Sequence, residues 1–87
     1  MERINTEIPI HHFKQGEVIK IVRLELTGTM KRRLLDLGFI PGAIIHVLQK
    51  SPLGDPTAFR VSHTTIALRA EECNQIFGER LEGDFHE

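Results

Sequence analysis

The sequence TGTMKRRLLDLGFIPGAIIHVLQK, residues 27–50, places a helical pattern directly before a strand pattern. Met30, Leu34 and Leu37 are spaced at i, i+4 and i+7, which puts their side chains on one stripe of a short helix. Leu35 lies off that stripe, because successive residues are about 100° apart around a helix. The spacing therefore predicts an amphipathic helix that packs on a core through the stripe and turns Leu35 elsewhere.

Both ends of this helix have capping signals. Thr27 or Thr29 can accept a hydrogen bond from the free amides at its start, and Gly38 stands where a left-handed residue ends a helix. Pro41 and Gly42 suit the two central positions of a type II turn, because proline fixes the first φ and glycine accepts a positive second φ. The turn is expected to start the next strand.

Five strand patterns accompany the helix. Residues 17–24 and 43–50 are rich in valine and isoleucine, which favour strands. Large apolar residues take every second position at residues 59–62 and 66–69, as in strands with one buried face, and residues 76–77 resemble a last short strand. Strands this short, in a domain this small, are most economically closed into a partly open barrel, because closure removes unpaired edges. The predicted fold class is therefore mainly β with one short helix.

Turn residues separate these strands along the chain. The loop SPLGDP contains Pro52, Gly54 and Pro56, which end one strand before the next begins. We expect His63 and Thr64 to link the two alternating strands as a hairpin.

Composition limits the classes of function. With 87 residues, the chain has room for one domain, and its hydrophobic content of 40% predicts a folded one. The formal net charge of -1 gives no global positive field for nucleic acid. Cys73 is the single cysteine, so no intrachain disulfide forms and a reducing compartment, the cytoplasm, is expected. We expect neither a signal peptide nor direct membrane insertion, because no run of about 20 apolar residues occurs.

No residue pattern indicates catalysis or a resident metal. The possible metal ligands have spacings that preset no site, and they are His11, His12, His46, His63, His86 and Cys73. Adjacent His11 and His12 are expected to point to different sides. Cys73 follows two glutamates, which raise the pKa of a thiol, so we interpret it as a half-buried structural residue. The glycines form no phosphate-binding loop. We therefore expect no enzyme activity, no cofactor and no metal site.

Leu35 is the candidate contact residue for a protein partner. Lys31, Arg32 and Asp36 surround it on the helix, and an apolar side chain with a charged rim is typical of an interaction hot spot. The alternative is that Leu35 packs beneath the SPLGDP loop or the N-terminal segment. The partner-binding hypothesis therefore names Lys31, Arg32 and Leu35.

Three motifs occur in one order: KRRLLDLGFIPG at residues 31–42, SPLGDP at residues 51–56 and TTIALR at residues 64–69. With these motifs, the chain closely resembles the FeoA family. The resemblance implies a domain at residues 8–80 that forms an SH3-like barrel of five to six antiparallel strands, with the helix inserted after the first strand.

The resemblance also implies a function. A FeoA-type protein is an accessory protein of bacterial ferrous iron uptake in the cytoplasm, and its partner is FeoB, a membrane iron permease. It is expected to dock on the cytoplasmic GTP-binding part of that permease and to modulate it, and to reach the inner membrane only through it. A homo-oligomer is compatible with the sequence. His63 departs from the family, in which many members have glycine in the hairpin, and residues 1–7 and 81–87 are expected to be flexible tails.

Two other functions are compatible with the residues. The first is a nucleic-acid-binding barrel, against which the net charge argues; its cations are Lys31, Arg32, Arg33, Arg60 and Arg69. The second is a stand-alone regulatory domain like the C-terminal domain of DtxR-type metal-dependent repressors, which shares the fold. No helix-turn-helix pattern precedes such a domain in this sequence. Nucleic-acid binding is distinguished by a steep salt dependence.

Overall fold

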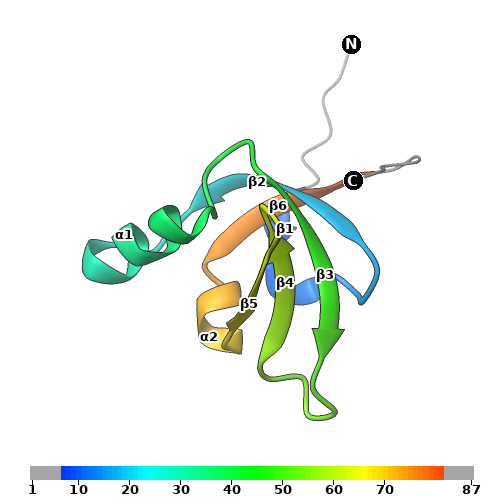
Figure 1. Cartoon of the computed structure of the whole chain (residues 1–87). Coiled ribbons are helices and arrows are strands. Elements are labelled where there is room, and N and C mark those ends of the chain that lie inside the picture. Colours follow the sequence, from blue (N-terminus) through cyan, green and yellow to red (C-terminus); the bar gives the residue numbers. More distant parts are fainter. Residues whose placement is uncertain (1–6, 82–87) are drawn as a thin grey trace.

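The computed structural model of the protein describes residues 7–81 and shows one curved antiparallel sheet with helices at its margins (Figure 1). The strands are β1 (Ile8–Pro9), β2 (Val18–Leu24), β3 (Ile44–Lys50), β4 (Thr57–Val61), β5 (Thr64–Leu68) and β6 (Ile76–Leu81). The helical elements are the 3-10 helix η1 (Ile10–His12) and the α-helices α1 (Gly28–Leu37) and α2 (Ala70–Cys73). Most of the two predicted tails, residues 1–6 and 82–87, lies outside the described residues. Within the described part of the chain, no helix is long and apolar enough to cross a membrane.

The strands follow the order β1-β6-β2-β3-β4-β5 across the sheet. All neighbouring strands are antiparallel and the sheet bends around its core, which confirms the predicted mainly β, SH3-like barrel. The helix α1 follows the second strand rather than the first. The reason is that Ile8 pairs with Gly78 and so begins a two-residue strand, which is too short to leave an alternating pattern in the sequence.

The core fills the inner face of this sheet. Ile19, Ile45 and Phe59 are fully buried, and Ile10 in η1 belongs to the same core. Phe39, which follows α1, meets Phe59 edge to face, with ring centroids 6.1 Å apart and an interplanar angle of 90°. Aromatic pairs favour this arrangement because the positive ring edge faces the negative ring face. The chain after α1 is thereby packed onto the sheet.

The predicted apolar stripe holds α1 on the core. Leu34 is 0% exposed, and Met30 and Leu37 pack against the core while staying partly exposed, which confirms the stripe. The predicted side-chain cap is absent, because Thr27 occupies the N-cap position without a side-chain hydrogen bond. Gly28, with a φ of 66°, departs from helical geometry at this end.

Gly38 ends α1 in the left-handed conformation predicted for it. Its φ is 110°, and its amide donates to the carbonyl oxygens of Leu34 and Leu35. A Cβ at this position would lie 2.7 Å from Cγ1 of Val61 in β4. Glycine is therefore required both by the positive φ and by the close approach of β4.

The predicted turn at Pro41 and Gly42 is confirmed. The amide of Ala43 donates to the carbonyl oxygen of Ile40 at 2.9 Å, and Gly42 has a φ of 94°, as in a type II turn. The amide of Gly42 also donates to the carbonyl oxygen of Ile21 at 2.7 Å. The turn is thus bonded to β2 before β3 begins.

The loop between β3 and β4 is held by its own hydrogen bonds. The Ser51 hydroxyl donates to the Asp55 carbonyl oxygen at 2.7 Å and accepts from the Asp55 amide at 2.9 Å. The amide of Gly54 donates to the carbonyl oxygen of Ser51 at 2.8 Å. Pro52, Gly54 and Pro56 therefore lie in the turn predicted for them.

The hairpin between β4 and β5 turns one residue earlier than predicted. Ser62 and His63, with φ values of 49° and 68°, form the two-residue turn, while Thr64 already pairs with Val61. Two positive φ values are typical of a type I′ turn. The prediction that Thr64 belongs to the turn is wrong, because a β-branched residue strongly resists a positive φ.

The last strand is longer than the one predicted at residues 76–77, and Leu81, predicted to begin a tail, is its final residue. The local sequence contains a glycine and charges, which do not favour a strand. Pairing with β2 stabilises it instead, with Leu81 opposite Val18. Gly78 allows β6 to approach β2 closely, because a Cβ there would lie 2.5 Å from Cγ2 of Ile19 and 2.8 Å from the carbonyl oxygen of Lys20.

Candidate functional site

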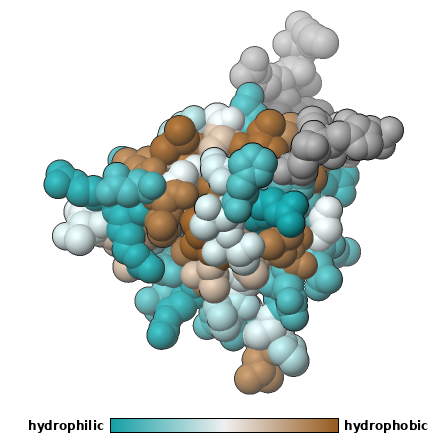
Figure 2. All heavy atoms as spheres, in the orientation of Figure 1, coloured by the Kyte–Doolittle hydropathy of each residue, from teal (hydrophilic) through white to brown (hydrophobic). Residues whose placement is uncertain are grey.

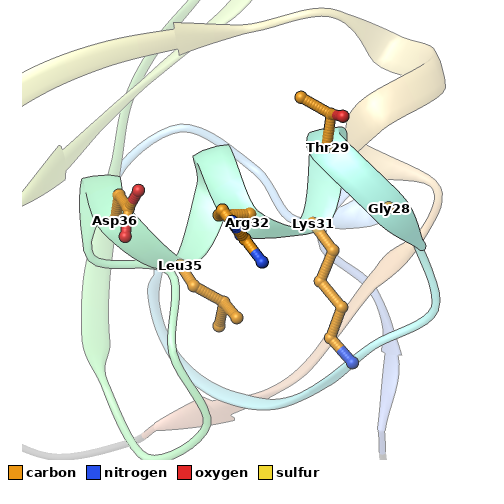
Figure 3. A pocket seen from close by; sticks show the side chains of 6 residues that line it. All are labelled: Gly28, Thr29, Lys31, Arg32, Leu35 and Asp36. Atoms are coloured by element: carbon orange, nitrogen blue, oxygen red, sulfur yellow. The ribbon is translucent and has the colours of Figure 1, made fainter.

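The outer face of α1 presents the three residues of the partner-binding hypothesis. Leu35 is half-buried and does not belong to the apolar residues that form or contact the core. Lys31 and Arg32, one turn earlier, are exposed. The three side chains extend from the same edge of the helix in Figure 3. In Figure 2, hydrophilic atoms project from the α1 side of the molecule, with apolar atoms directly beside them.

A hollow of about 640 Å³ lies along this outer face. Its lining residues are Gly28, Thr29, Lys31, Arg32, Leu35 and Asp36. Gly28, Lys31, Arg32 and Leu35 form a second stripe of α1, at i, i+3, i+4 and i+7. Gly28 and Thr29 are not among the predicted site residues; the second stripe is the sequence signal that points to Gly28, and it does not include Thr29.

The two cations of the outer face differ from the cation that follows them. Among the described residues, neither Lys31 nor Arg32 has an ion pair or a side-chain hydrogen-bond partner. The Arg33 guanidinium, by contrast, lies 3.5 Å from the carboxylate of Glu72, whose side chain is 9% exposed, and 3.9 Å from Sδ of Met30. Arg33 therefore connects α1 to α2, whereas Lys31 and Arg32 remain available to a partner.

The cations named for a nucleic-acid surface are divided among three parts of the fold. Lys31, Arg32 and Arg33 belong to α1, Arg60 lies in β4, and Arg69 precedes α2. Arg33 is already paired with an acidic residue. The whole chain has 11 lysines and arginines against 12 acidic residues. This balance gives such a surface no electrostatic support.

The histidines within residues 7–81 lie in three separate parts of the fold. Among the described residues, no group of three or more His, Cys, Asp and Glu side chains could hold a metal ion. His11 and His12 meet edge to face in η1, with ring centroids 5.9 Å apart, although the two side chains leave the backbone in different directions. In a 3-10 helix consecutive side chains are about 120° apart, and rings of this size still touch. His46 and His63 lie in β3 and in the hairpin turn, and His86 lies outside the described residues.

Cys73 is fully buried in the core rather than half-buried as predicted. Burial, together with a smaller effect of the neighbouring Glu72 carboxylate, raises the pKa of its thiol to about 12, and Lys50 opposes this change. A thiol with this pKa is protonated at neutral pH and is not a nucleophile. The predicted direction of the pKa shift is confirmed, although burial contributes more than the glutamate charge.

This domain has a relative in which it forms a small part of a larger protein. The chain is 38% identical over 61 residues to the Fe(2+) transport protein A/Fe(2+) transporter FeoB fusion protein of Porphyromonas gingivalis. The match covers 70% of this chain and 7% of that protein. The chain thus spans less than a tenth of this relative.

Solved structures share the fold. The solution structure of iron(II) transport protein A from Clostridium thermocellum has a TM-score of 0.82 at 32% identity, and the match covers 85% of this chain and 46% of that one. The crystal structure of Stenotrophomonas maltophilia FeoA complexed with zinc, described as a procaryotic SH3 domain protein, has a TM-score of 0.71 at 23% identity, over 80% of this chain and 87% of that one. That second likeness concerns the fold alone. The sequence profile of the FeoA domain matches residues 8–80, and the chain therefore belongs to the FeoA family.

Proposed function

We propose that this protein is an accessory protein of bacterial ferrous iron uptake, which docks through the outer face of α1 on the cytoplasmic part of a FeoB-type membrane iron permease. The observation that supports docking is the half-buried Leu35 outside the core, beside Lys31 and Arg32, which form no ion pair within residues 7–81. A folded monomer gains little from such an arrangement. A contact surface uses it, because a central apolar group is desolvated while the rim charges orient the partner.

The Porphyromonas gingivalis relative supports the choice of partner. In that protein, a region similar to this chain is part of one fusion protein with an Fe(2+) transporter, FeoB. Fusion keeps two domains at a high effective concentration without a strong interface. Direct contact between the two domains needs a surface on this one, and we assign that role to the outer face of α1. In this proposal the protein is cytoplasmic and reaches the membrane through the permease.

In this docking, Leu35 and the cations Lys31 and Arg32 have different roles. Leu35 enters an apolar recess of the permease, and Lys31 and Arg32 face carboxylates at its rim. Rim charges mainly increase the association rate, whereas burial of an apolar anchor mainly slows dissociation. A bound protein then modulates the permease by stabilising one of its conformations. The proposal assigns no chemical step to this chain.

Binding to the detergent-solubilised, full-length permease tests this proposal. Arg32→Glu should weaken binding by about tenfold or more, because an unfavourable charge contact at an interface costs several kcal/mol. Lys20→Glu is the matched control, because Lys20 is also exposed but lies in β2. Equal binding by the wild type and Arg32→Glu, or equal losses in both variants, would contradict the assignment of the docking face.

The same protein preparation distinguishes the nucleic-acid alternative. Affinity for duplex and single-stranded DNA is measured across salt concentrations, because phosphate contacts produce a steep decrease with added salt. We expect weak binding at physiological salt. Tight binding that decreases steeply with salt and is lost in Arg60→Gln would replace the docking proposal.

A further inference from the structure

The strand β5 is an open edge of the sheet, since among the described strands it pairs with β4 alone. In a hairpin with a two-residue turn, Val61 and Thr64 form the first hydrogen-bonded pair. Bonded and non-bonded pairs then alternate along an antiparallel ladder. The amide and carbonyl groups of Thr65 and Ala67 therefore point away from β4.

In its own sequence and pairing, β5 lacks several features that usually protect an edge strand. Natural edge strands are shortened, bent by a bulge, or supplied with charges or proline. The β5 sequence TTIAL is uncharged, and its register against β4 is continuous. At the other edge of the sheet, β1 is two residues long and contains Pro9. One edge is thus blunted, and the other is open to an additional strand.

The surroundings of β5 are cationic on one face and apolar on the other. Arg60 in β4 lies opposite Thr65 and is exposed, so its side chain belongs to the outer face beside the edge. Arg69 directly follows β5 and is also exposed. Neither arginine has an ion pair with a described residue. Ile66 points to the opposite face, where it is partly buried against the core.

A hollow of about 440 Å³ adjoins the end of this edge and is lined by Asp55, Pro56, Ala67 and Arg69. Asp55 is the acidic residue of the hollow, and its Oδ1 accepts a hydrogen bond from the amide of Ala70 at 2.9 Å. The Asp55 carboxylate keeps its negative charge in this bond, so one arginine and one aspartate line the hollow, and the preference of the β5 edge for acidic groups depends on Arg60 and Arg69 together.

We propose that β5 binds an extended peptide segment that alternates apolar and acidic side chains and joins the sheet as an additional strand. Its backbone pairs with the outward groups of Thr65 and Ala67. Its acidic side chains meet Arg60 and Arg69, and its apolar side chains pack beside Ile66. Strand addition of this kind takes its affinity from main-chain hydrogen bonds and its specificity from alternate side chains.

Charge complementarity favours this occupant over a second copy of the chain. In a dimer joined through β5, Arg60 and Arg69 of both copies would lie along the same pair of strands. Neither TTIAL strand contains an acidic residue to neutralise these charges. A lipid surface offers no ladder of amides and carbonyls to Thr65 and Ala67. The inference is independent of permease docking, which uses α1.

Hydrogen exchange of the full-length protein, followed by NMR, tests this inference. The probe is a short capped peptide of alternating valine and glutamate, and the charge control is the same peptide with lysine in place of glutamate. We expect the glutamate peptide to slow exchange of the Thr65 and Ala67 amides by about tenfold or more, because a bonded amide exchanges only on opening. The lysine peptide should leave their exchange unchanged.

Variants at one position separate the backbone contact from side-chain effects. Ala67→Pro removes the outward amide but no bond to β4, so the fold should be retained, as a thermal melt verifies. Its affinity for the glutamate peptide should decrease by about tenfold, whereas Ala67→Ser keeps the amide and should bind like the wild type. Arg69→Gln should also bind the glutamate peptide several-fold more weakly, which keeps the test decisive if the proline variant does not fold.

Equal protection by both peptides would overturn the inference, as would protection of other amides but not those of Thr65 and Ala67. Unchanged binding in both Ala67→Pro and Arg69→Gln would overturn it as well. A concentration-dependent dimer in sedimentation experiments, abolished by Ala67→Pro, would assign the edge to a second copy of the chain instead.

Discussion

The core face and the outer face of α1 make different contacts, although residues of the two faces alternate along the same helix. Leu34 is 0% exposed within the core, while the adjacent Leu35 is half-buried outside it. Arg33 is paired with Glu72 in α2, while the adjacent Arg32 has no such partner among the described residues. Identical residue types therefore have different roles, and the position around the helix separates them.

This contrast predicts that stability and binding respond to different substitutions. Changes on the core face should lower the free energy of unfolding and affect binding only through loss of the folded state. Changes on the outer face should lower binding and leave unfolding nearly unchanged, because exposed side chains contribute little to stability.

Leu34→Ala should have the largest effect on stability. It deletes a fully buried side chain and should lower the free energy of unfolding by about 2 to 5 kcal/mol, from lost burial and a residual cavity. Urea unfolding followed by circular dichroism measures this. A loss below about 1 kcal/mol would show that α1 does not depend on its core stripe.

Gly38→Ala should come next, with a loss of about 1 to 3 kcal/mol. Two costs combine here, namely the φ of 110° and a Cβ that would lie 2.7 Å from Cγ1 of Val61. Gly16→Ala is the matched control, because Gly16 has a φ of 93° but nothing within 4 Å of an added Cβ. Equal losses in the two variants, measured by urea unfolding, would mean that Val61 moves aside and that only the backbone resists.

Leu35→Ala should lower the free energy of unfolding by less than about 1 kcal/mol. Its affinity for the permease should nevertheless decrease by about tenfold or more, as expected for the apolar centre of an interface. The two measurements are unfolding of the isolated protein and binding to the full-length permease. A stability loss as large as that of Leu34→Ala would place Leu35 in the core and end the docking proposal.

The smallest effect should distinguish the two arginines. Arg33→Gln should cost about 0.5 kcal/mol, because its pairing with Glu72 is partly exposed and therefore weak. Arg32→Gln should leave the melting temperature unchanged. The difference should disappear in about 1 M salt, which screens charges beyond about 3 Å. Equal melting temperatures of Arg33→Gln and Arg32→Gln at low salt would show that the ion pair of Arg33 adds no measurable stability.

Predictions for the central segment succeeded where a few neighbouring residues define the conformation. The stripe of α1, the Gly38 cap and the Pro41 turn each depend on residues within one or two turns of chain. The hairpin was misplaced by one residue, because its position depends on which residues tolerate a positive φ, and Ser62 accepts one where Thr64 does not. Local sequence contained that information as well, in the β-branching of threonine.

Predictions for the sheet margins failed where stability comes from pairing with a distant strand. Ile8 pairs with Gly78, and Leu81 pairs with Val18, so neither β1 nor the end of β6 has a sufficient local signal. Likewise, the burial of Cys73 depends on the core as a whole rather than on its glutamate neighbours.

For the candidate site, helical spacing was enough to place Lys31, Arg32 and Leu35 on one outer face, because a helix repeats its geometry from residue to residue. Tertiary packing decided which cations of α1 form an ion pair. Arg33 meets Glu72 across 39 positions of sequence, and only the folded chain brings α2 to α1. Local sequence therefore determined which way the side chains of α1 point, and the approach of distant segments determined which of them already have partners, because ion pairs and burial depend on neighbours in space rather than along the chain.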